Sequence, residues 1–144
     1  MSIVVRIATA SDIDAIEYLY NELNDYLETH ENYPRWKKGV YPIREDAYCQ
    51  VEWQIEFDVP VITICKLAVH PKYFGCGVGK ALLDYAACVG KQRNVKAIRL
   101  DVYEKNLPAI RLYEKSGFKD MGLIDLGLEK IYGLKWYRVF EKIL

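Results

Sequence analysis

A glycine-rich segment between a strand pattern and a helix pattern constrains this chain more than any other feature. Residues Val61 to Val69 form a near-continuous apolar run, and the segment after it places glycines at 75, 77 and 79 directly before an amphipathic stretch. Such glycines remove the Cβ atoms that would keep backbone N–H groups from converging on one point, and the following helix contributes its positive dipole end. The pattern therefore predicts an anion-binding site, and phosphate is the expected ligand.

Two familiar nucleotide-binding loops fit this segment poorly. A Walker loop needs a glycine five positions before its Gly-Lys pair and a Ser or Thr after it, whereas this chain has Phe74 and Ala81 at those positions. A dinucleotide fingerprint needs Gly-x-Gly-x-x-Gly, whereas the glycines here recur at every second residue and Lys80 follows them. A glycine-rich turn without a ligand is the alternative for this segment taken by itself.

A second segment, Ala97 to Phe118, combines a strand pattern with a capped helix. Asn106 suits the N-cap of that helix, Pro108 its first turn and Gly117 its end. Together with Val69 to Gly79, this segment resembles the GNAT superfamily of N-acetyltransferases, in which the glycine loop binds the pyrophosphate of coenzyme A and Asn106 to Phe118 corresponds to a second signature. The resemblance implies an α/β fold with a mixed, mostly antiparallel central sheet, a V-shaped splay between the two central parallel strands, and flanking helices.

The resemblance also implies an activity, the transfer of the acetyl group of acetyl-CoA to a primary amine by direct attack in a ternary complex. In the family, the backbone of the central strand holds the pantetheine arm and polarises the thioester carbonyl. Tyr113 matches the family's general acid and Asn106 a cofactor contact, while core packing and helix capping are their structural alternatives. The expected cofactor-binding residues are Leu67, Ala68, Val69, Phe74, Gly75, Cys76, Gly77, Val78, Gly79, Lys80, Asn106 and Tyr113.

Two positions of the glycine loop depart from the family's pattern. Phe74 stands where Gln or Arg is usual, and Cys76 stands where a basic residue is common. Neither change removes a backbone N–H donor, so we expect cofactor binding to survive, with lower affinity.

The general base and the acceptor are less clearly marked. His70 fits best as a loop residue of the family's Val-x-Pro pattern, and the candidate bases are Glu52, Glu56, Asp58 and Glu104. An aromatic-lined acceptor pocket would be formed by Trp36, Tyr41 and Trp53, although such residues often only cover a core. A small amine, a peptide N-terminus and a lysine side chain all stay open as acceptors.

Composition restricts the other functions of the chain. Its 144 residues suit a single domain, and 20 basic against 20 acidic side chains provide no net field for nucleic acid or an anionic membrane. Four cysteines without a Cys-x-x-Cys pair predict neither a zinc site nor disulfides, and suit the reducing cytoplasm. No segment predicts a targeting leader or a membrane span. A homodimer is neither indicated nor excluded.

Hydrophobic periodicity predicts the order of the elements. A helix opens at Ser11 to Asp14 and ends near His30, and a loop rich in aromatic residues follows from Asn32 to Pro42. The inward residues of a helix over 78–92 are Val78, Leu82, Tyr85, Ala86 and Val89. Strands are predicted over residues 3–8, 61–69, 97–102, 118–124 and 134–143.

The segment Ala47 to Pro60 is shorter than the resemblance requires. The family places an antiparallel hairpin before the glycine-loop strand, and these residues are too few for two strands and a helix end. Either the hairpin is shortened, or residues are missing from the chain at Gln50–Val51 or Asp58–Val59. A Cα separation near 3.8 Å at both junctions would rule out missing residues.

Two other classes of protein stay open. A non-catalytic acyl-CoA-binding or regulatory domain would keep the phosphate loop without turnover, although Tyr113 and Asn106 are both present. A nucleotide-binding module is the third choice, and it would bind nucleotide with magnesium, for which this loop lacks the hydroxyl.

Overall fold

The computed structural model of this protein describes residues 2–38 and 60–144. The chain divides into two compact units, each taken by itself below. The first unit holds residues up to Lys38 and Lys66–Tyr85, and the second holds Pro60 to Cys65 and Ala86–Leu144. The expectation of a single domain over residues 1–144 therefore stays a proposal.

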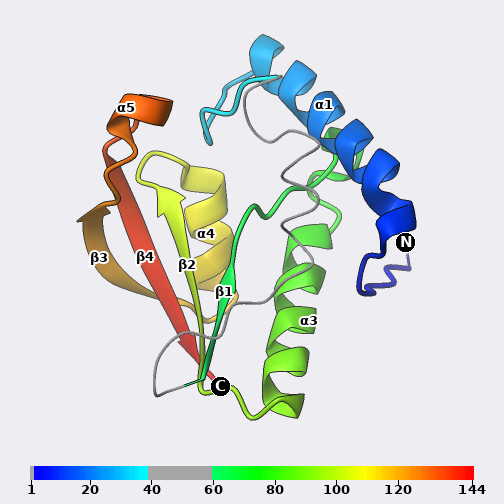
Figure 1. Ribbon diagram of the computed structural model, residues 1–144, viewed down its shortest axis with the longest axis vertical. Coiled ribbons are helices and arrows are strands. Elements are labelled where there is room, and N and C mark those ends of the chain that lie inside the picture. Colours follow the sequence, from blue (N-terminus) through cyan, green and yellow to red (C-terminus); the bar gives the residue numbers. More distant parts are fainter. Residues whose placement is uncertain (1, 39–59) are drawn as a thin grey trace. The chain divides into compact units, whose positions relative to one another are not determined.

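The second unit is built on a four-stranded sheet in the order β1-β2-β4-β3 (Figure 1). Strand β1 (Val61–Ile64) runs parallel to β2 (Ala97–Tyr103). Strand β4 (Trp136–Ile143) pairs antiparallel with both β2 and β3 (Lys119–Asp125). The prediction of a mixed, mostly antiparallel sheet is confirmed.

One face of this sheet forms the core of the second unit. Ile62, Ile98, Leu100 and Phe140 are almost completely buried, and their registered pairings put them on the same face. Helix α4 (Leu107–Lys115) packs there through Tyr113, and the second half of α3 (Val78–Gln92) packs there as well. The helix approaches so closely at Gly90 that an added Cβ would lie 2.5 Å from the Leu144 side chain.

Strand β1 is shorter than the apolar run predicted. The run extends to Val69, but the strand ends at Ile64, and residues 65–70 have no regular structure. Lys66 has φ +52°, in the left-handed region, so the chain turns out of the extended conformation and pairing with β2 stops at Leu100. Because β2 continues to Tyr103, it extends beyond the pairing with β1, as a splay between two parallel strands requires.

The first unit is organised around helix α1 (Ile13–Thr29), which ends one residue before His30, close to the predicted end. It buries one stripe, consisting of Ile13, Tyr20, Leu23, Asn24 and Leu27. Ile16 and Leu19, which recur at the same helical spacing in the sequence, are half-buried. The 3-10 helix η2 (Pro71–Tyr73) and the start of α3 belong to the same unit. Along α3, the predicted Ala86 and Val89 are buried, whereas the predicted Val78, Leu82 and Tyr85 are only partly buried and Leu83 is buried instead of Leu82.

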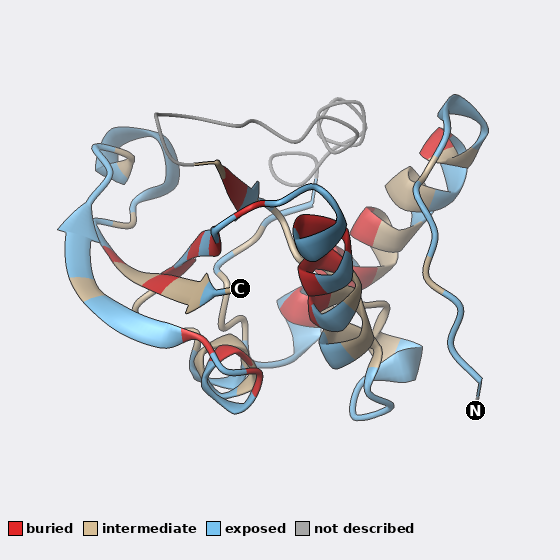
Figure 2. Cartoon of the chain, turned by 90° about the horizontal axis from the view of Figure 1, so that it is seen from below, coloured by how far each residue is buried: buried red, intermediate tan, exposed pale blue. Residues whose placement is uncertain are grey.

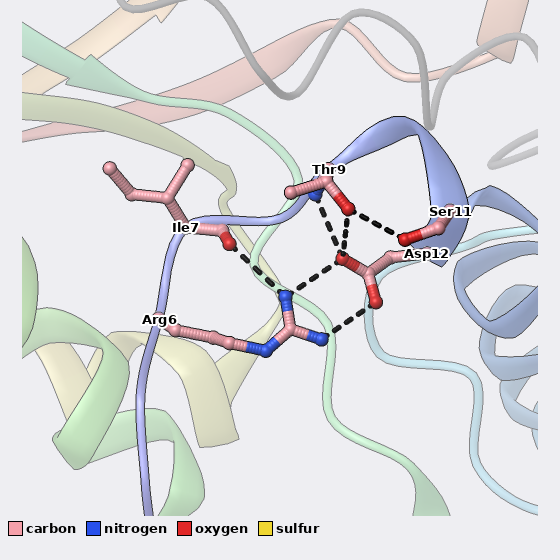
Figure 3. Close-up of polar contacts among 5 residues, drawn as sticks. All are labelled: Arg6, Ile7, Thr9, Ser11 and Asp12. Carbon is pink, nitrogen blue, oxygen red and sulfur yellow. Dashed lines mark hydrogen bonds and ion pairs between the residues drawn. The ribbon is translucent and has the colours of Figure 1, made fainter.

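The predicted strand over residues 3–8 is wrong. These residues have no strand assignment, and Val4 and Ile7 are exposed. Figure 3 shows what holds this segment instead: Arg6 donates two hydrogen bonds to the Asp12 carboxylate, at 2.8 and 2.7 Å. Asp12 closes the 3-10 turn η1 (Ala10–Asp12) and also accepts from the Thr9 N–H at 2.8 Å. The N-terminal segment is therefore fastened to the start of α1 by polar contacts.

The C-terminal elements follow the prediction with one addition. Helix α4 lies between the predicted Asn106 and Gly117, and β3 and β4 match the two closing strands to within about two residues at their ends. Helix α5 (Glu129–Tyr132) was not predicted, because four residues are too few to show helical periodicity. Figure 2 shows β3 as an exposed strand at the outer edge of the sheet.

Two expectations concern residues outside the described part of the chain. The hairpin between Ala47 and Pro60, and the junctions at Gln50–Val51 and Asp58–Val59, fall almost wholly within residues 39–59 and stay untested. Within residues 2–38 and 60–144, no helix has the length and apolarity needed to cross a membrane.

Candidate functional site

The glycine loop lies at the start of α3 in the first unit. Residues 74–77 form a turn, in which Gly75 has φ +72° and Gly77 has φ +82°. An added Cβ at either position would meet no atom within 4 Å, so these glycines are needed for the backbone conformation and not for packing space.

The loop leads directly into the N-terminus of α3. After the turn, the Ala81 N–H donates to the Gly77 oxygen at 3.0 Å, which begins the helical hydrogen bonding. The N–H groups of Val78, Gly79 and Lys80 precede it, and such groups at a helix start are the donors that bind phosphate. Lys80 forms an i,i+4 ion pair with Asp84, so its charge is already partly engaged.

Leu67, Ala68 and Val69 connect β1 to the loop. All three are half-buried and lie outside regular structure, and Ala68 packs against the buried pair Ile13 and Tyr20. The Ala68 side chain thus contributes to the core of the first unit. The backbone of these three residues is not part of a strand, which suits the role of a ligand contact made through N–H and C=O groups.

One predicted acceptor residue lies in the described part of the chain. Trp36 is half-buried, and the Asn32 side chain fixes its backbone by donating to the Trp36 oxygen at 2.7 Å and accepting from the Trp36 N–H at 3.1 Å. Tyr41 and Trp53 lie outside the described residues, so the structure does not test whether the three side chains meet.

Tyr113 lies on α4 in the second unit and is 6% exposed. Its ring packs against Phe140 and Phe118, with centroid distances of 5.7 and 6.1 Å. Burial, and secondarily the negative charge of Asp101, raise the pKa of the Tyr113 hydroxyl well above its ordinary value. The phenol therefore stays protonated, as a hydrogen-bond donor must.

Asn106 stands at the N-cap of α4, where its backbone oxygen accepts from the Ile110 N–H at 3.1 Å. Its side chain makes no capping hydrogen bond. Asn106 therefore begins α4 through its backbone oxygen alone. Its side-chain carboxamide is not used for capping and could contact a ligand.

Asp101 is the site candidate that the sequence analysis missed. It is the first residue of β2 beyond the pairing with β1, and its register puts it on the same face as Tyr103 and Tyr137. The two tyrosine rings lie 6.4 Å apart, edge to face. Surrounding atoms displace enough water to raise the pKa of the Asp101 carboxyl, although the residue as a whole is exposed.

A weak signal for Asp101 was present in the sequence. Strand β2 alternates buried Ile98, Leu100 and Val102 with polar Arg99 and Asp101. Arg99 forms an ion pair with Glu141, whereas Asp101 forms none within residues 2–38 and 60–144. Of the four predicted bases, Glu104 is half-buried and donates its N–H to the Trp136 oxygen at 3.2 Å. The other three, Glu52, Glu56 and Asp58, lie outside the described residues.

Comparison with known proteins gives a consistent result. The model of the acetyltransferase (GNAT) family matches residues 14–118. Among curated proteins, the chain is 30% identical over 106 residues to the UPF0157 protein YqkA of Bacillus subtilis, covering 74% of this chain but 28% of that protein. It is 29% identical over 126 residues to the peptidyl-lysine N-acetyltransferase YiaC of Escherichia coli, covering 80% of this chain and 82% of that one.

Solved structures agree with the family match. The ribosomal-protein-alanine N-acetyltransferase of Brucella melitensis has a TM-score of 0.72 at 17% identity, covering 99% of this chain and 100% of that one, which shows the fold. A streptothricin acetyltransferase of Bacillus anthracis in complex with acetyl-CoA has a TM-score of 0.55 at 25% identity, covering 64% of this chain and 53% of that one.

Proposed function

Because this chain belongs to the acetyltransferase (GNAT) family, we propose that it transfers the acetyl group of acetyl-CoA to a primary amine by direct attack in a ternary complex. One observation carries the proposal: the family match spans both the glycine loop and the segment from Asn106 to Phe118. The left-handed conformations of Gly75 and Gly77, directly before the start of α3, fit a loop that binds pyrophosphate.

Binding of acetyl-CoA is assigned mainly to backbone groups. The N–H groups of Gly75 and of Gly77 to Lys80 receive the pyrophosphate, whereas those of Phe74 and Cys76 already donate to the Pro71 and Tyr73 oxygens. The backbone of Leu67 to Val69 receives the pantetheine arm and polarises the thioester carbonyl. A preorganised N–H at that carbonyl stabilises the oxyanion that develops as the amine attacks. The changes at Phe74 and Cys76 leave these donors in place. Asn106 adds a contact through its carboxamide.

Proton transfer is assigned to side chains of the second unit. The amine nitrogen forms a bond to the acetyl carbon, the carbon–sulfur bond breaks, and the proton lost by the nitrogen goes to Asp101, directly or through one water. Burial raises the pKa of Asp101, and an ionised carboxylate with a raised pKa is a stronger base than an ordinary aspartate. Tyr113 donates a hydrogen bond to the leaving thiolate. Because the pKa of the Tyr113 hydroxyl is raised, this group acts by positioning the thiolate through a hydrogen bond more than by transferring a proton to it.

The acceptor to test first is the side-chain amine of a peptide lysine. YiaC, which is similar over most of both chains, is a peptidyl-lysine N-acetyltransferase. Small amines and peptide N-termini are the alternatives, and Trp36 with Tyr41 and Trp53 would form the pocket wall. The exposed thiols of Cys65, Cys76 and Cys88 suit a protein of the cytoplasm, where acetyl-CoA is also found.

Ligand-dependent thermal unfolding tests the cofactor. A ligand that binds only the native state raises the unfolding midpoint, so acetyl-CoA and CoA, each in excess, should raise it and ATP should not. Release of CoA thiol should then occur with acetyl-CoA and a lysine peptide together, and with neither alone. Binding of CoA without turnover of any amine would favour the non-catalytic acyl-CoA-binding alternative, which the comparisons do not support. No shift with either CoA species would overturn the proposal.

A further inference from the structure

A stripe of α1 supports the segment that leads into the glycine loop. Tyr18, Glu22 and Tyr26, here called the α1 stripe, recur at intervals of four residues and so lie on one helix face. The segment they support runs from His70 to Phe74 and contains η2. All of these residues belong to the first unit.

His70 makes the first contact with the stripe. Its Nδ1 accepts a hydrogen bond from the Lys72 N–H at 3.1 Å and so caps η2. A neutral ring that accepts at Nδ1 carries its proton at Nε2, and Nε2 lies 3.9 Å from the Glu22 carboxylate. The His70 ring also stacks with Tyr18, at a centroid distance of 6.2 Å. His70 is therefore held from two sides.

Phe74 makes the second contact. Its ring meets Tyr26 edge to face, with a centroid distance of 5.2 Å, and Tyr26 in turn stacks on His30 at 3.7 Å. Phe74 directly precedes Gly75, so this contact fixes the loop at the residue where its left-handed turns begin. The Phe74 ring thus contacts α1, and its N–H donates to the Pro71 oxygen at 3.1 Å, so residue 74 is held through both its side chain and its backbone.

We propose that the α1 stripe positions the glycine loop for acetyl-CoA, so that Tyr26 and Glu22 determine cofactor affinity without touching the cofactor. This inference rests on the proposed function. Two left-handed glycines leave the loop many conformations, and ordering it on binding costs free energy. Fixing both ends of η2 against a helix removes part of that cost in advance, which raises affinity through preorganisation.

The test is the dissociation constant of acetyl-CoA, measured by calorimetry, with the unfolding midpoint of each variant as a folding control. Tyr26→Ala should weaken acetyl-CoA binding about two- to tenfold, the range for loss of an aromatic pair. Tyr26→Phe keeps the ring and should bind like the wild type. Glu22→Gln should weaken binding up to about twofold, whereas Glu28→Gln, a matched carboxylate elsewhere on α1, should leave it unchanged.

Kinetics and a second variant separate positioning from general damage. In Tyr26→Ala, the KM for acetyl-CoA should rise while kcat at saturating acetyl-CoA stays within about twofold, since the stripe touches no reacting atom. Phe74→Ala removes an exposed ring and should reproduce the loss. The double variant should lose no more than either single one, because both remove the same contact.

Three results would overturn the inference. The first is wild-type affinity in folded Tyr26→Ala or Phe74→Ala. The second is additive losses in the double variant, which would mean that the two rings act separately. The third is a wild-type protein that binds no acetyl-CoA, which would overturn the proposed function as well, so the wild-type measurement distinguishes the two failures.

Discussion

The glycine loop and helix α4 carry the two signature segments of this chain, but they are built in opposite ways. The loop is exposed from Phe74 to Gly77, and its important groups are backbone N–H donors set by two positive φ angles. On α4 the important group is a side chain, Tyr113, which is packed between Phe118 and Phe140. Substitutions in the loop should therefore change ligand affinity, and substitutions at Tyr113 should change stability as well as chemistry.

The largest effect is expected from Tyr113→Ala. Removing a buried aromatic ring should cost about 3–5 kcal/mol of unfolding free energy, measured by urea denaturation. Tyr113→Phe keeps the ring, so its unfolding free energy should stay within about 1.5 kcal/mol of the wild type, while kcat for thiol release falls. An alanine variant as stable as the wild type would show that Tyr113 is not a core residue, and the contrast drawn here between the loop and α4 would be wrong.

Asp101→Asn tests whether the second unit also has a side chain that acts in catalysis and not in stability. If Asp101 is the base, kcat/KM should fall by about 100-fold or more, and the unfolding midpoint should change little because the residue is exposed. In the wild type, the acidic limb of the pH–rate profile should lie above the ordinary aspartate value of 3.8, because the pKa of Asp101 is raised. Glu114→Gln, an exposed carboxylate on α4, serves as the control, and equal losses in both variants would argue against a specific role.

Gly77→Ala sharpens the loop side of the comparison. A non-glycine residue held at φ +82° costs about 1–2 kcal/mol, so acetyl-CoA should bind roughly 5- to 30-fold more weakly. Gly127→Ala is a matched control, since Gly127 also has a positive φ and open space around it but lies between β3 and α5. That control should lower stability slightly and leave acetyl-CoA affinity unchanged. A loss of affinity in both variants would show that the glycine loop has no specific role in binding acetyl-CoA.

The smallest effect on stability is expected at the start of α1, where polar contacts, and not buried side chains, hold the N-terminal segment. The Arg6 guanidinium, together with the Thr9 N–H, holds the pKa of Asp12 far below its ordinary value of 3.8. A depressed folded-state pKa means that the stabilisation is present above pH 3.8 and is lost as pH falls toward the folded-state value. The wild type should therefore have a higher urea midpoint than Asp12→Asn at pH 6–7, and the gap should close below pH 3.8. A gap independent of pH would show that the carboxylate charge contributes nothing.

Much of the fold could be read from local patterns. Helix α3 matched its predicted bounds and α1 ended within one residue of His30, because an amphipathic stripe of four or five turns is a strong periodic signal. The strand at residues 3–8 failed because a short apolar alternation becomes a strand only when a partner strand pairs with it. No strand pairs with this segment within residues 2–38 and 60–144, and Arg6 binds Asp12 instead.

The candidate site likewise contains residues that the sequence predicted and one residue, Asp101, that it did not. Gly75 and Gly77 were found because only glycine adopts their backbone conformation at no cost, a requirement visible in the sequence. Asp101 was missed because one carboxylate on a strand looks like any solvent-facing residue until the end of the neighbouring strand is known. The end of β1 is set by Lys66, whose left-handed backbone conformation could not be predicted from the apolar run.

The sequence by itself determined the family, the order of the longer elements from α1 to β4, α5 excepted, and the position of the glycine loop, because these depend on local conformation and on periodic burial. The tertiary structure alone decided where β1 separates from β2, which carboxylate lies at that point, and that Phe74 packs on Tyr26. These features depend on contacts between residues far apart in the chain. No local preference specifies such contacts.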